Sequence, residues 1–326
     1  MVNKKNVIIL GAGSIGTAIG NSLAQSEDLR ISLLSVEEDV VESISKEQIN
    51  QKYFPNIRLN SRLQATSNEL VLQDSNIVLL AIPSVAAVDY LKNINHLLPK
   101  DAIIVNLAKG FGCGKRLITD CIKEQHLNPI CTLKGPSFAR EILSNIPTAF
   151  TLASEDDKIL DEVETIFKNT NLYIDKSNDL EGVEILSILK NIYAIIIGIV
   201  DAHFNSPNLR FMIFTKAFNE MRKIMMVFGG KEETMFKYCG IGDFGLTALN
   251  DLSRNRTLGL LIGKGFFTED ISGKVVLEGR IAMNVFLEKL SDQNIDPLEY
   301  SLMRELEHVF SGNNDVSGFV NKLLKY

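Results

Sequence analysis

The chain has 326 residues, which exceeds one comfortable hydrophobic core and predicts two domains. Its 45% hydrophobic and 23% charged residues are typical of a soluble globular protein. The formal net charge of -6 excludes an electrostatic platform for nucleic acid or an acidic membrane surface. The four cysteines show no CxxC spacing and no histidine pairing, and no secretory leader precedes the first apolar run. We therefore expect reduced thiols, no metal site and a cytoplasmic protein.

A β-branched run over residues 6–10 predicts the first strand, and the motif G-x-G-x-x-G follows it with Gly11, Gly13 and Gly16. Helical spacing of apolar residues then begins. In this arrangement the first glycine allows a tight turn and the second lets the backbone approach a pyrophosphate. The third lets helix and strand pack closely, so that the helix N-terminus is aimed at the anion. These features predict a Rossmann-type dinucleotide-binding domain.

The second predicted strand, 30–35, is followed by Glu37, about 20 residues past the glycine motif, where an acidic residue grips the ribose hydroxyls. No arginine stands at position 35 or 36 to receive a 2′-phosphate. The pattern therefore favours NAD over NADP as the cofactor. The alternative is that Glu37 and Glu38 form a solvated turn. Residues 40–50 predict a helix.

Further strands are predicted at 76–82, 102–107, 129–133, 148–152 and 172–174. Their nearly continuous apolar character is typical of a parallel sheet with helices on both faces. Polar residues follow the strands: Pro83-Ser84, Lys109-Gly110, and the run 135–139. Ligands of such sheets bind outside the carboxyl ends of the strands. We therefore expect Lys109 to reach an anionic substrate.

From about residue 181 the strands stop, and an all-α domain is predicted over 183–326 after the α/β domain of 1–182. Its helices are expected at 184–202, 211–228, 231–238, 253–264, 280–291, 297–310 and 317–324. Asp243 follows a glycine pair, so a loop presents its carboxylate. Ser253 precedes a helical pattern and is expected to cap it, while Arg254 would hold a phosphate bidentately. The alternative is a plain cap beside a surface cation.

The stretch 184–201 is apolar on every face of a helix and contains one charged residue, Lys190, between its acidic ends. Such a helix is buried on all sides, and it is too short and too polar at Lys190-Asn191 to span a membrane. An unpaired buried ammonium costs several kcal/mol, so Lys190 needs a carboxylate partner or a substrate anion. The alternative is a lysine that extends to the helix edge.

Taken together, these segments resemble the bacterial-type NAD(P)-dependent glycerol-3-phosphate dehydrogenases over nearly the whole chain. The shared motifs are GAGSIGTA at 11–18, LAKG at 107–110, GPSFAREI at 135–142, IPTAFTLAS at 146–154, LKNIYAI at 189–195, GIGDFGLT at 240–247, SRNR at 253–256 and VVLEG at 275–279. The resemblance implies reversible hydride transfer between NAD(P)H and dihydroxyacetone phosphate, giving sn-glycerol 3-phosphate for phospholipid synthesis.

The resemblance also implies residue roles. Lys190 corresponds to the acid–base lysine of the family, assisted by Lys109 and Asp243. The implied substrate contacts are Lys109, Gly135, Ser137, Lys190, Asp243, Thr247, Ser253, Arg254 and Asn255. The implied cofactor contacts are Gly11, Gly13, Ser14, Ile15, Gly16, Glu37, Lys109, Ala139, Arg254, Val276 and Glu278.

The chain departs from the family pattern in three places. A glycine-rich run is replaced by residues 202–207, ahead of Asn208 and Arg210; Lys216 follows Thr215 where an arginine is usual; and the second strand ends in Leu-Ser-Val at 34–36. The first change concerns the loop beside the implied active site, and the last concerns NADP handling. We expect His203, beside Asp201, to be structural rather than part of a metal or catalytic pair.

Two other functions fit parts of the pattern. One is another two-domain dehydrogenase, acting on a hydroxyacyl-CoA or a sugar acid, although Arg254-Asn255 favours a small phosphate. The other is a non-catalytic dinucleotide sensor derived from the enzyme, suggested by the altered loop 202–207. Because apolar helices such as 211–228 exceed what one small domain easily covers, we also expect a homodimer.

Overall fold

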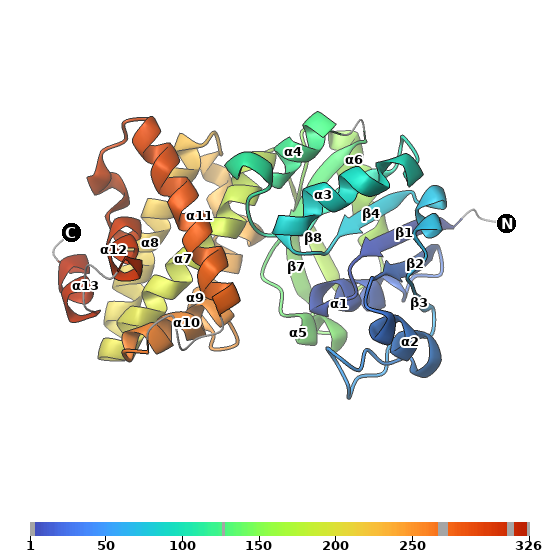
Figure 1. Cartoon of the computed structure of the whole chain (residues 1–326), viewed down its shortest axis with the longest axis horizontal. Helices are drawn as coiled ribbons and strands as arrows, with labels where there is room; N and C mark the ends of the chain where they lie inside the picture. The colour runs from blue at the N-terminus through green and yellow to red at the C-terminus, as the bar shows by residue number, and fades with distance from the viewer. Residues whose placement is uncertain (1–3, 126–127, 267–272, 312–315, 325–326) are drawn as a thin grey trace. The chain divides into compact units, whose positions relative to one another are not determined.

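The protein, seen in a computed structural model, is described over residues 4–125, 128–266, 273–311 and 316–324, with the side chains of the last two ranges described for 279–311 and 318–324. The chain divides into two compact units, Met1–Leu180 and Glu181–Tyr326 (Figure 1). The predicted boundary after residue 182 lies in the first turn of a helix that begins at Leu180.

The first unit contains an eight-stranded sheet within its described residues. The strands are β1 (Lys5–Leu10), β2 (Leu29–Leu34), β3 (Leu63–Thr66), β4 (Ile77–Leu80), β5 (Ile103–Asn106), β6 (Ile130–Lys134), β7 (Thr148–Ala153) and β8 (Leu172–Ser177). The α-helices are α1 (Ser14–Leu23), α2 (Glu38–Glu47), α3 (Ser84–Ile94), α4 (Ile118–Gln125), α5 (Ala139–Leu143) and α6 (Asp157–Glu164).

The strand order is β3-β2-β1-β4-β5-β6-β7-β8, and the first six strands are parallel. Alternate residues of β1 enter two separate cores, with Val7 and Ile9 facing α1, α2, α5 and α6, and Ile8 and Leu10 facing α3 and α4. The prediction of a Rossmann-type sheet covered by helices on both faces is confirmed. The order reverses between β1 and β4, which is where open α/β sheets bind their ligands.

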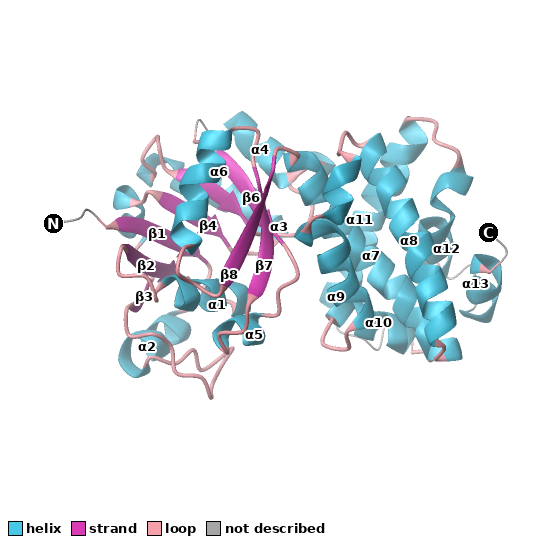
Figure 2. Cartoon of the chain, turned by 180° about the vertical axis from the view of Figure 1, so that it is seen from behind, coloured by secondary structure: helices cyan, strands magenta, loops and turns pink. Residues whose placement is uncertain are grey.

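The predicted parallel sheet has one exception at β7, which pairs with β6 in the antiparallel sense; β8 then follows β7 in parallel (Figure 2). The link from β6 to β7 contains only the five-residue helix α5, which packs against α1. Five helical residues span about 8 Å, whereas a six-residue strand spans about 20 Å, so α5 cannot carry the chain back along the sheet. The sequence analysis also missed β3, whose LQAT sequence is too short and mixed to show a period.

The second unit is helical throughout its described residues (Figure 2). Its α-helices are α7 (Leu180–Phe204), α8 (Pro207–Val227), α9 (Asp243–Leu249), α10 (Arg254–Gly263), α11 (Gly273–Asp292), α12 (Ser301–Phe310) and α13 (Val316–Leu323). The helix predicted at 231–238 is not an α-helix: a 3₁₀ helix, Glu232–Phe236, is followed by a π turn, Tyr238–Gly242. Within the π turn, Gly240 has a non-helical ψ of -106°, so the chain is kinked shortly before α9 begins.

Helix α7 forms the centre of the second unit, as its uniformly apolar sequence predicts. It is long and apolar enough to cross a membrane, yet 94% of its most apolar window is buried within the protein. Gly198 of α7 and Gly259 of α10 allow close approach of the two helices, since a Cβ on Gly259 would lie 2.1 Å from the Ile195 carbonyl oxygen. A core helix explains the composition of this segment fully.

Glu220 links three helices in the core of this unit. The hydroxyl of Tyr193 on α7 donates a hydrogen bond of 2.7 Å to its carboxylate. The carboxylate also accepts bonds of 2.9 Å from the backbone N–H groups of Leu302 and Met303, so it caps the start of α12. Burial raises the pKa of Glu220 from 4.5 to about 7, although the backbone and Tyr193 hydrogen bonds oppose the shift.

We expect Glu220 to make the stability of this unit depend on pH. Because its folded-state pKa is raised, the folded state binds the proton more tightly, and stability is lost as the pH rises from about 4.5 through about 7. The loss is at most about 3 kcal/mol in the free energy of unfolding. Glu220→Gln should flatten this dependence in thermal unfolding followed at pH 5 to 8. The exposed Glu233→Gln variant is the control; parallel curves for wild type and Glu220→Gln would contradict the assignment.

Candidate active site

The ammonium group of Lys190 lies in the core of the second unit and is held by two side chains of α9. Its Nζ lies 2.5 Å from Asp243 Oδ1 and donates to Thr247 Oγ1 at 2.9 Å. The side chains of Lys190 and Asp243 are only 5% and 2% exposed. Of the two kinds of partner expected for Lys190, a carboxylate or a substrate anion, the structure contains the carboxylate, Asp243.

The start of α9 determines this geometry. Asp243 and Thr247 are four residues apart, so they lie on one face of the helix and reach the same ammonium. Asp243 occupies the first turn, where the helix dipole favours a carboxylate. Phe244 is fully buried and stacks on Phe214 of α8 with ring centroids 4.5 Å apart. The stack fixes the rotation of α9 and with it the direction of Asp243.

Helix α10 begins as the sequence predicts. The Ser253 hydroxyl accepts a hydrogen bond of 3.3 Å from the backbone N–H of Arg256, which confirms Ser253 as the N-cap. Arg254 is exposed and Asn255 is half-buried at the first turn. A guanidinium, an amide and helix N–H groups are the donors that a phosphate monoester accepts.

A buried ion-pair network holds the start of α10, and sequence reasoning missed it. Arg256 Nη1 lies 2.6 Å from Asp201 Oδ2 and also donates to the Ala248 carbonyl at 3.1 Å, while Arg256 Nε donates to Asp251 Oδ1 at 2.9 Å. Arg210 Nε binds both oxygens of Asp201, at 2.8 and 2.6 Å. The available signal was the second arginine of SRNR, which lies one helical turn past the cap.

The residues that depart from the family pattern also take part in structure. Ser206, inside the altered loop 202–207, caps α8 by accepting from the Leu209 N–H. Lys216 donates to the Leu323 carbonyl oxygen at 3.1 Å, at the end of α13. The ring of His203 contacts Phe204 at a centroid distance of 5.0 Å, whereas the Asp201 carboxylate is bound by arginines.

In the first unit the glycine turn has the geometry that the motif predicts. Gly11 has a φ of +104°, and a Cβ on Gly16 would lie 2.1 Å from the Gly11 carbonyl oxygen. Gly13 caps α1 without a side-chain hydrogen bond, and a Cβ placed on it would meet no atom within 4 Å. The buried Asn50 donates to the Ala12 carbonyl at 2.9 Å and so holds the turn. Sequence reasoning missed Asn50 because it lies about 40 residues beyond the motif.

Glu37 lies between β2 and α2, directly before the first residue of α2, and two side chains from the loop after α2 contact it. Lys52 forms an ion pair with Glu37 Oε1, and the Tyr53 hydroxyl donates to Oε2 at 3.2 Å. Glu37 is therefore not simply a residue of a solvated turn. Lys52 supplies a cation in the region where positions 35 and 36 carry no arginine.

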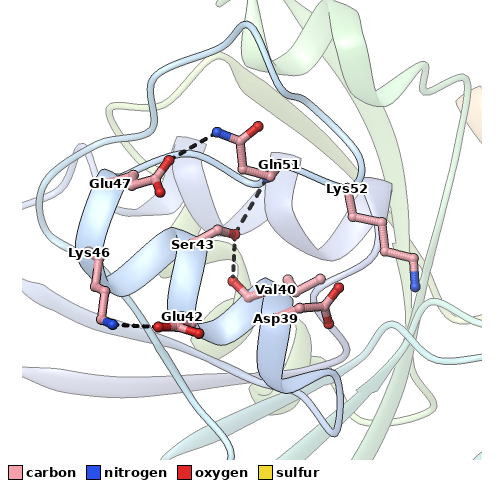
Figure 3. Close-up of a pocket in the computed structure, with 8 residues that line it drawn as sticks. All are labelled: Asp39, Val40, Glu42, Ser43, Lys46, Glu47, Gln51 and Lys52. Carbon is pink, nitrogen blue, oxygen red and sulfur yellow. Dashed lines mark hydrogen bonds and ion pairs between the residues drawn. The ribbon is translucent and has the colours of Figure 1, made fainter.

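A shallow surface hollow lies over α2 and the loop that contains Gln51 and Lys52 (Figure 3). Its polar side chains bond to one another: Lys46 pairs with Glu42, and Gln51 Nε2 donates to Glu47 at 3.0 Å (Figure 3). Because neighbours already satisfy these groups, and none of them belongs to the glycine turn, we assign no ligand to this hollow.

The remaining residues predicted to contact substrate or cofactor lie in the first unit, except Val276 and Glu278. Lys109 and Ser14 are exposed, and the partly buried Ile15 and Ala139 pack on the sheet. Gly135 is buried and approaches β7 closely, since a Cβ on it would lie 2.5 Å from the Ala149 carbonyl oxygen. The Ser137 hydroxyl donates to the Gly135 carbonyl at 3.1 Å. The side chains of Val276 and Glu278 lie outside the described residues. Across the described chain, no cluster of three His, Cys, Asp or Glu residues is arranged to hold a metal.

Two models of one known protein family match most of the chain, one in each unit. Residues 6–160 match the family described as NAD-dependent glycerol-3-phosphate dehydrogenase N-terminus, and residues 179–321 match the corresponding C-terminus. A glycerol-3-phosphate dehydrogenase (NAD(P)+) of Halothermothrix orenii is 35% identical over 84% of this chain and 81% of its own. That of Clostridium tetani is 35% identical over 87% and 82%.

The solved structures agree with the sequence relatives. A glycerol-3-phosphate dehydrogenase from Coxiella burnetii superposes with a TM-score of 0.88 at 29% identity, covering 99% of both chains. More distant folds, such as a ketopantoate reductase from Ralstonia eutropha with a TM-score of 0.58 at 12% identity, share only the architecture. The chain therefore belongs to the NAD-dependent glycerol-3-phosphate dehydrogenase family and is an NAD(P)-dependent oxidoreductase.

Proposed function

We propose that the protein interconverts dihydroxyacetone phosphate and sn-glycerol 3-phosphate with NADH or NADPH, and that the product supplies phospholipid synthesis. The observation that carries the proposal is the buried ammonium of Lys190, bound by Asp243 and Thr247, within a chain of this family. An oriented ammonium in a dry site is the group that a ketone reduction requires.

The glycine turn of the first unit fits a dinucleotide. The space beside Gly13 and the absence of a side-chain cap on α1 leave room for a pyrophosphate against the helix start. Gly11, Gly13, Ser14, Ile15, Gly16 and Ala139 would hold the cofactor, and Lys109 and Arg254 are proposed as further cofactor contacts. When bound, the nicotinamide supplies or accepts the hydride.

The chain's own residues do the proton chemistry and the positioning. During reduction, negative charge develops on the substrate carbonyl oxygen; Lys190 stabilises it and then donates a proton from Nζ, and in the reverse direction Nζ accepts that proton. Asp243 offsets the buried charge of Lys190, and Thr247 fixes its direction. Ser253, Arg254 and Asn255 would bind the phosphate of the substrate, and that binding energy positions the reacting carbon. Lys109, Gly135 and Ser137 are proposed as further substrate contacts.

The experiment that tests this function is a spectrophotometric assay of the purified chain with dihydroxyacetone phosphate, using NADH and NADPH in parallel. Turnover with at least one cofactor is the expected result. Tight cofactor binding without turnover of any triose phosphate would favour the sensor. Turnover only of a hydroxyacyl-CoA or a sugar acid would favour another dehydrogenase.

We propose that Glu37 gives the enzyme a preference for NADH, which Lys52 moderates. The Glu37 carboxylate would accept hydrogen bonds from the ribose hydroxyls and repel a 2′-phosphate, while the Lys52 ammonium offsets its charge. Glu37→Gln should lower kcat/KM for NADH about tenfold and spare NADPH, because charged hydrogen bonds contribute about 1.5–3 kcal/mol. Lys52→Met should lower kcat/KM for NADPH. Glu38→Gln, one residue away on α2, is the matched control, and an equal effect of both glutamate changes would refute the assignment.

We also propose a cytoplasmic homodimer. The support is a set of exposed apolar side chains at the end of α7 and on α8: Phe204 is 47%, Phe211 56% and Met212 40% exposed. Large apolar side chains exposed in one part of a protein often belong to a contact with another chain. Light scattering at micromolar concentration should give twice the chain mass of 36.3 kDa. A monomer mass would count against the dimer.

A further inference from the structure

Lys134, the last residue of β6, is a buried lysine outside the predicted site. Its side chain is among the largest fully buried ones, with an exposed fraction of 1%. Its Nζ donates to the Asn106 carbonyl oxygen at 3.1 Å and to the Ala108 carbonyl oxygen at 2.5 Å. Asn106 is the last residue of β5, and Ala108 lies two residues beyond its carboxyl end.

The segment that Lys134 binds leads directly into Lys109. Thr132 Oγ1 also donates to the Asn106 carbonyl, and the Asn106 side chain accepts from the Ala108 N–H at 2.9 Å. Side chains thus bind two carbonyl groups and a backbone N–H group within residues 106–108. Lys109 is the first exposed residue after this buried segment.

A charged residue at this buried place needs a physical reason. Removing an ammonium from water costs several kcal/mol unless its donors are satisfied, and a methionine would fill the same space without that cost. What the ammonium offers is more than one donor from a single point, which lets it turn two carbonyls that are two residues apart inward. With those carbonyls turned inward, the backbone direction at Lys109 is set.

We propose that Lys134 is a positioning residue for the reaction: it clamps residues 106–108 so that Lys109 is presented at the carboxyl edge of the sheet. This inference rests on the proposed function, because it acts through Lys109. It assigns to a buried side chain, bound to backbone carbonyls, control over the placement of a cation that is proposed to bind the substrate.

A double-mutant cycle tests the coupling in the full chain. Lys134→Met should lower kcat/KM for dihydroxyacetone phosphate by about 10- to 100-fold, since small misplacements of a catalytic group cost up to about that much. In a Lys109→Met background the same change should cost less than about twofold, because the two residues act as one unit. Lys92→Met, which removes an exposed lysine from α3, is the matched control and should leave kcat/KM unchanged. Multiplicative effects of Lys134→Met and Lys109→Met would overturn the proposal.

Amide hydrogen exchange supplies a readout that needs no turnover. Lys134→Met should raise exchange in peptides covering 106–112 and leave peptides of β1 and α1 unchanged. Lys134→Gln keeps one donor group and should give an intermediate effect. If the methionine variant does not fold, Lys134→Gln replaces it in the double-mutant cycle. Unchanged exchange at 106–112 in either variant would overturn the clamp. If the wild type fails to turn over dihydroxyacetone phosphate, the proposed function fails while the exchange result still decides the clamp.

Discussion

Lys190→Ala should reduce turnover of dihydroxyacetone phosphate by about 10²- to 10⁴-fold, the usual contribution of a general acid–base group. The loss should appear in kcat and in kcat/KM alike, because the ammonium acts on charge that develops during the reaction. Steady-state kinetics with NADH measure it, and fluorescence titration of NADH should show nearly unchanged cofactor binding. Turnover close to that of the wild type would remove the proposed acid–base group.

The structure adds an expectation about stability to this variant. Removal of Lys190 leaves the Asp243 carboxylate, 2% exposed, without the ammonium that lies 2.5 Å from it. Leaving one member of a buried ion pair typically costs about 3–5 kcal/mol. Lys190→Met combined with Asp243→Asn removes both charges and keeps the volume, so it should recover much of the unfolding midpoint. It should not recover turnover, and that contrast separates the chemistry of Lys190 from its role in folding.

Strong local signals made much of the fold predictable. The glycine motif after a β-branched strand predicts the turn at Gly11. The φ of +104° at Gly11 and the close approach of Gly16 to the Gly11 carbonyl oxygen agree with that prediction. The apolar run around Lys190 predicts a core helix, and α7 is one. In both cases the information lies within about 25 contiguous residues, so a period or a motif is enough to reveal it.

The features that escaped prediction depend on residues far apart in the chain. The direction of β7 follows from the length of α5 and its packing on α1, which no strand pattern encodes. Lys134 and Asn50 are polar residues in apolar or loop contexts, and each donates to a backbone carbonyl that any residue type would supply. Asp201 and Arg256 are 55 residues apart. The pairing of Lys190 with Asp243 was anticipated only because the family resemblance brought the two motifs together.

Arg254→Met should lower kcat/KM for dihydroxyacetone phosphate by about 100-fold or more, since a bidentate, charge-assisted contact with phosphate is stronger than a neutral hydrogen bond. Arg254 is exposed at the first turn of α10, so the unfolding midpoint should hardly change. Ser253 and the buried Arg256 keep their own hydrogen bonds in this variant, and the helix start is preserved. Lys264→Met, which removes a positive charge at the other end of the same helix, is the matched control.

An assay with dihydroxyacetone, which lacks the phosphate, distinguishes a loss of phosphate binding from a general loss of activity. The wild type should use it far less well than the phosphate ester, because remote binding energy is what positions the carbonyl. Arg254→Met should process this truncated ketone about as well as the wild type does. The variant's preference for the phosphate ester over the truncated ketone should therefore fall only because kcat/KM for the ester falls. An equal loss on both substrates would mean that Arg254 contributes through its proposed cofactor contact or at the reacting carbon, and not through the phosphate of the substrate. Since Lys190 acts at the carbonyl, its variants should lose activity on both ketones, and the two residues would then separate chemistry from anchoring.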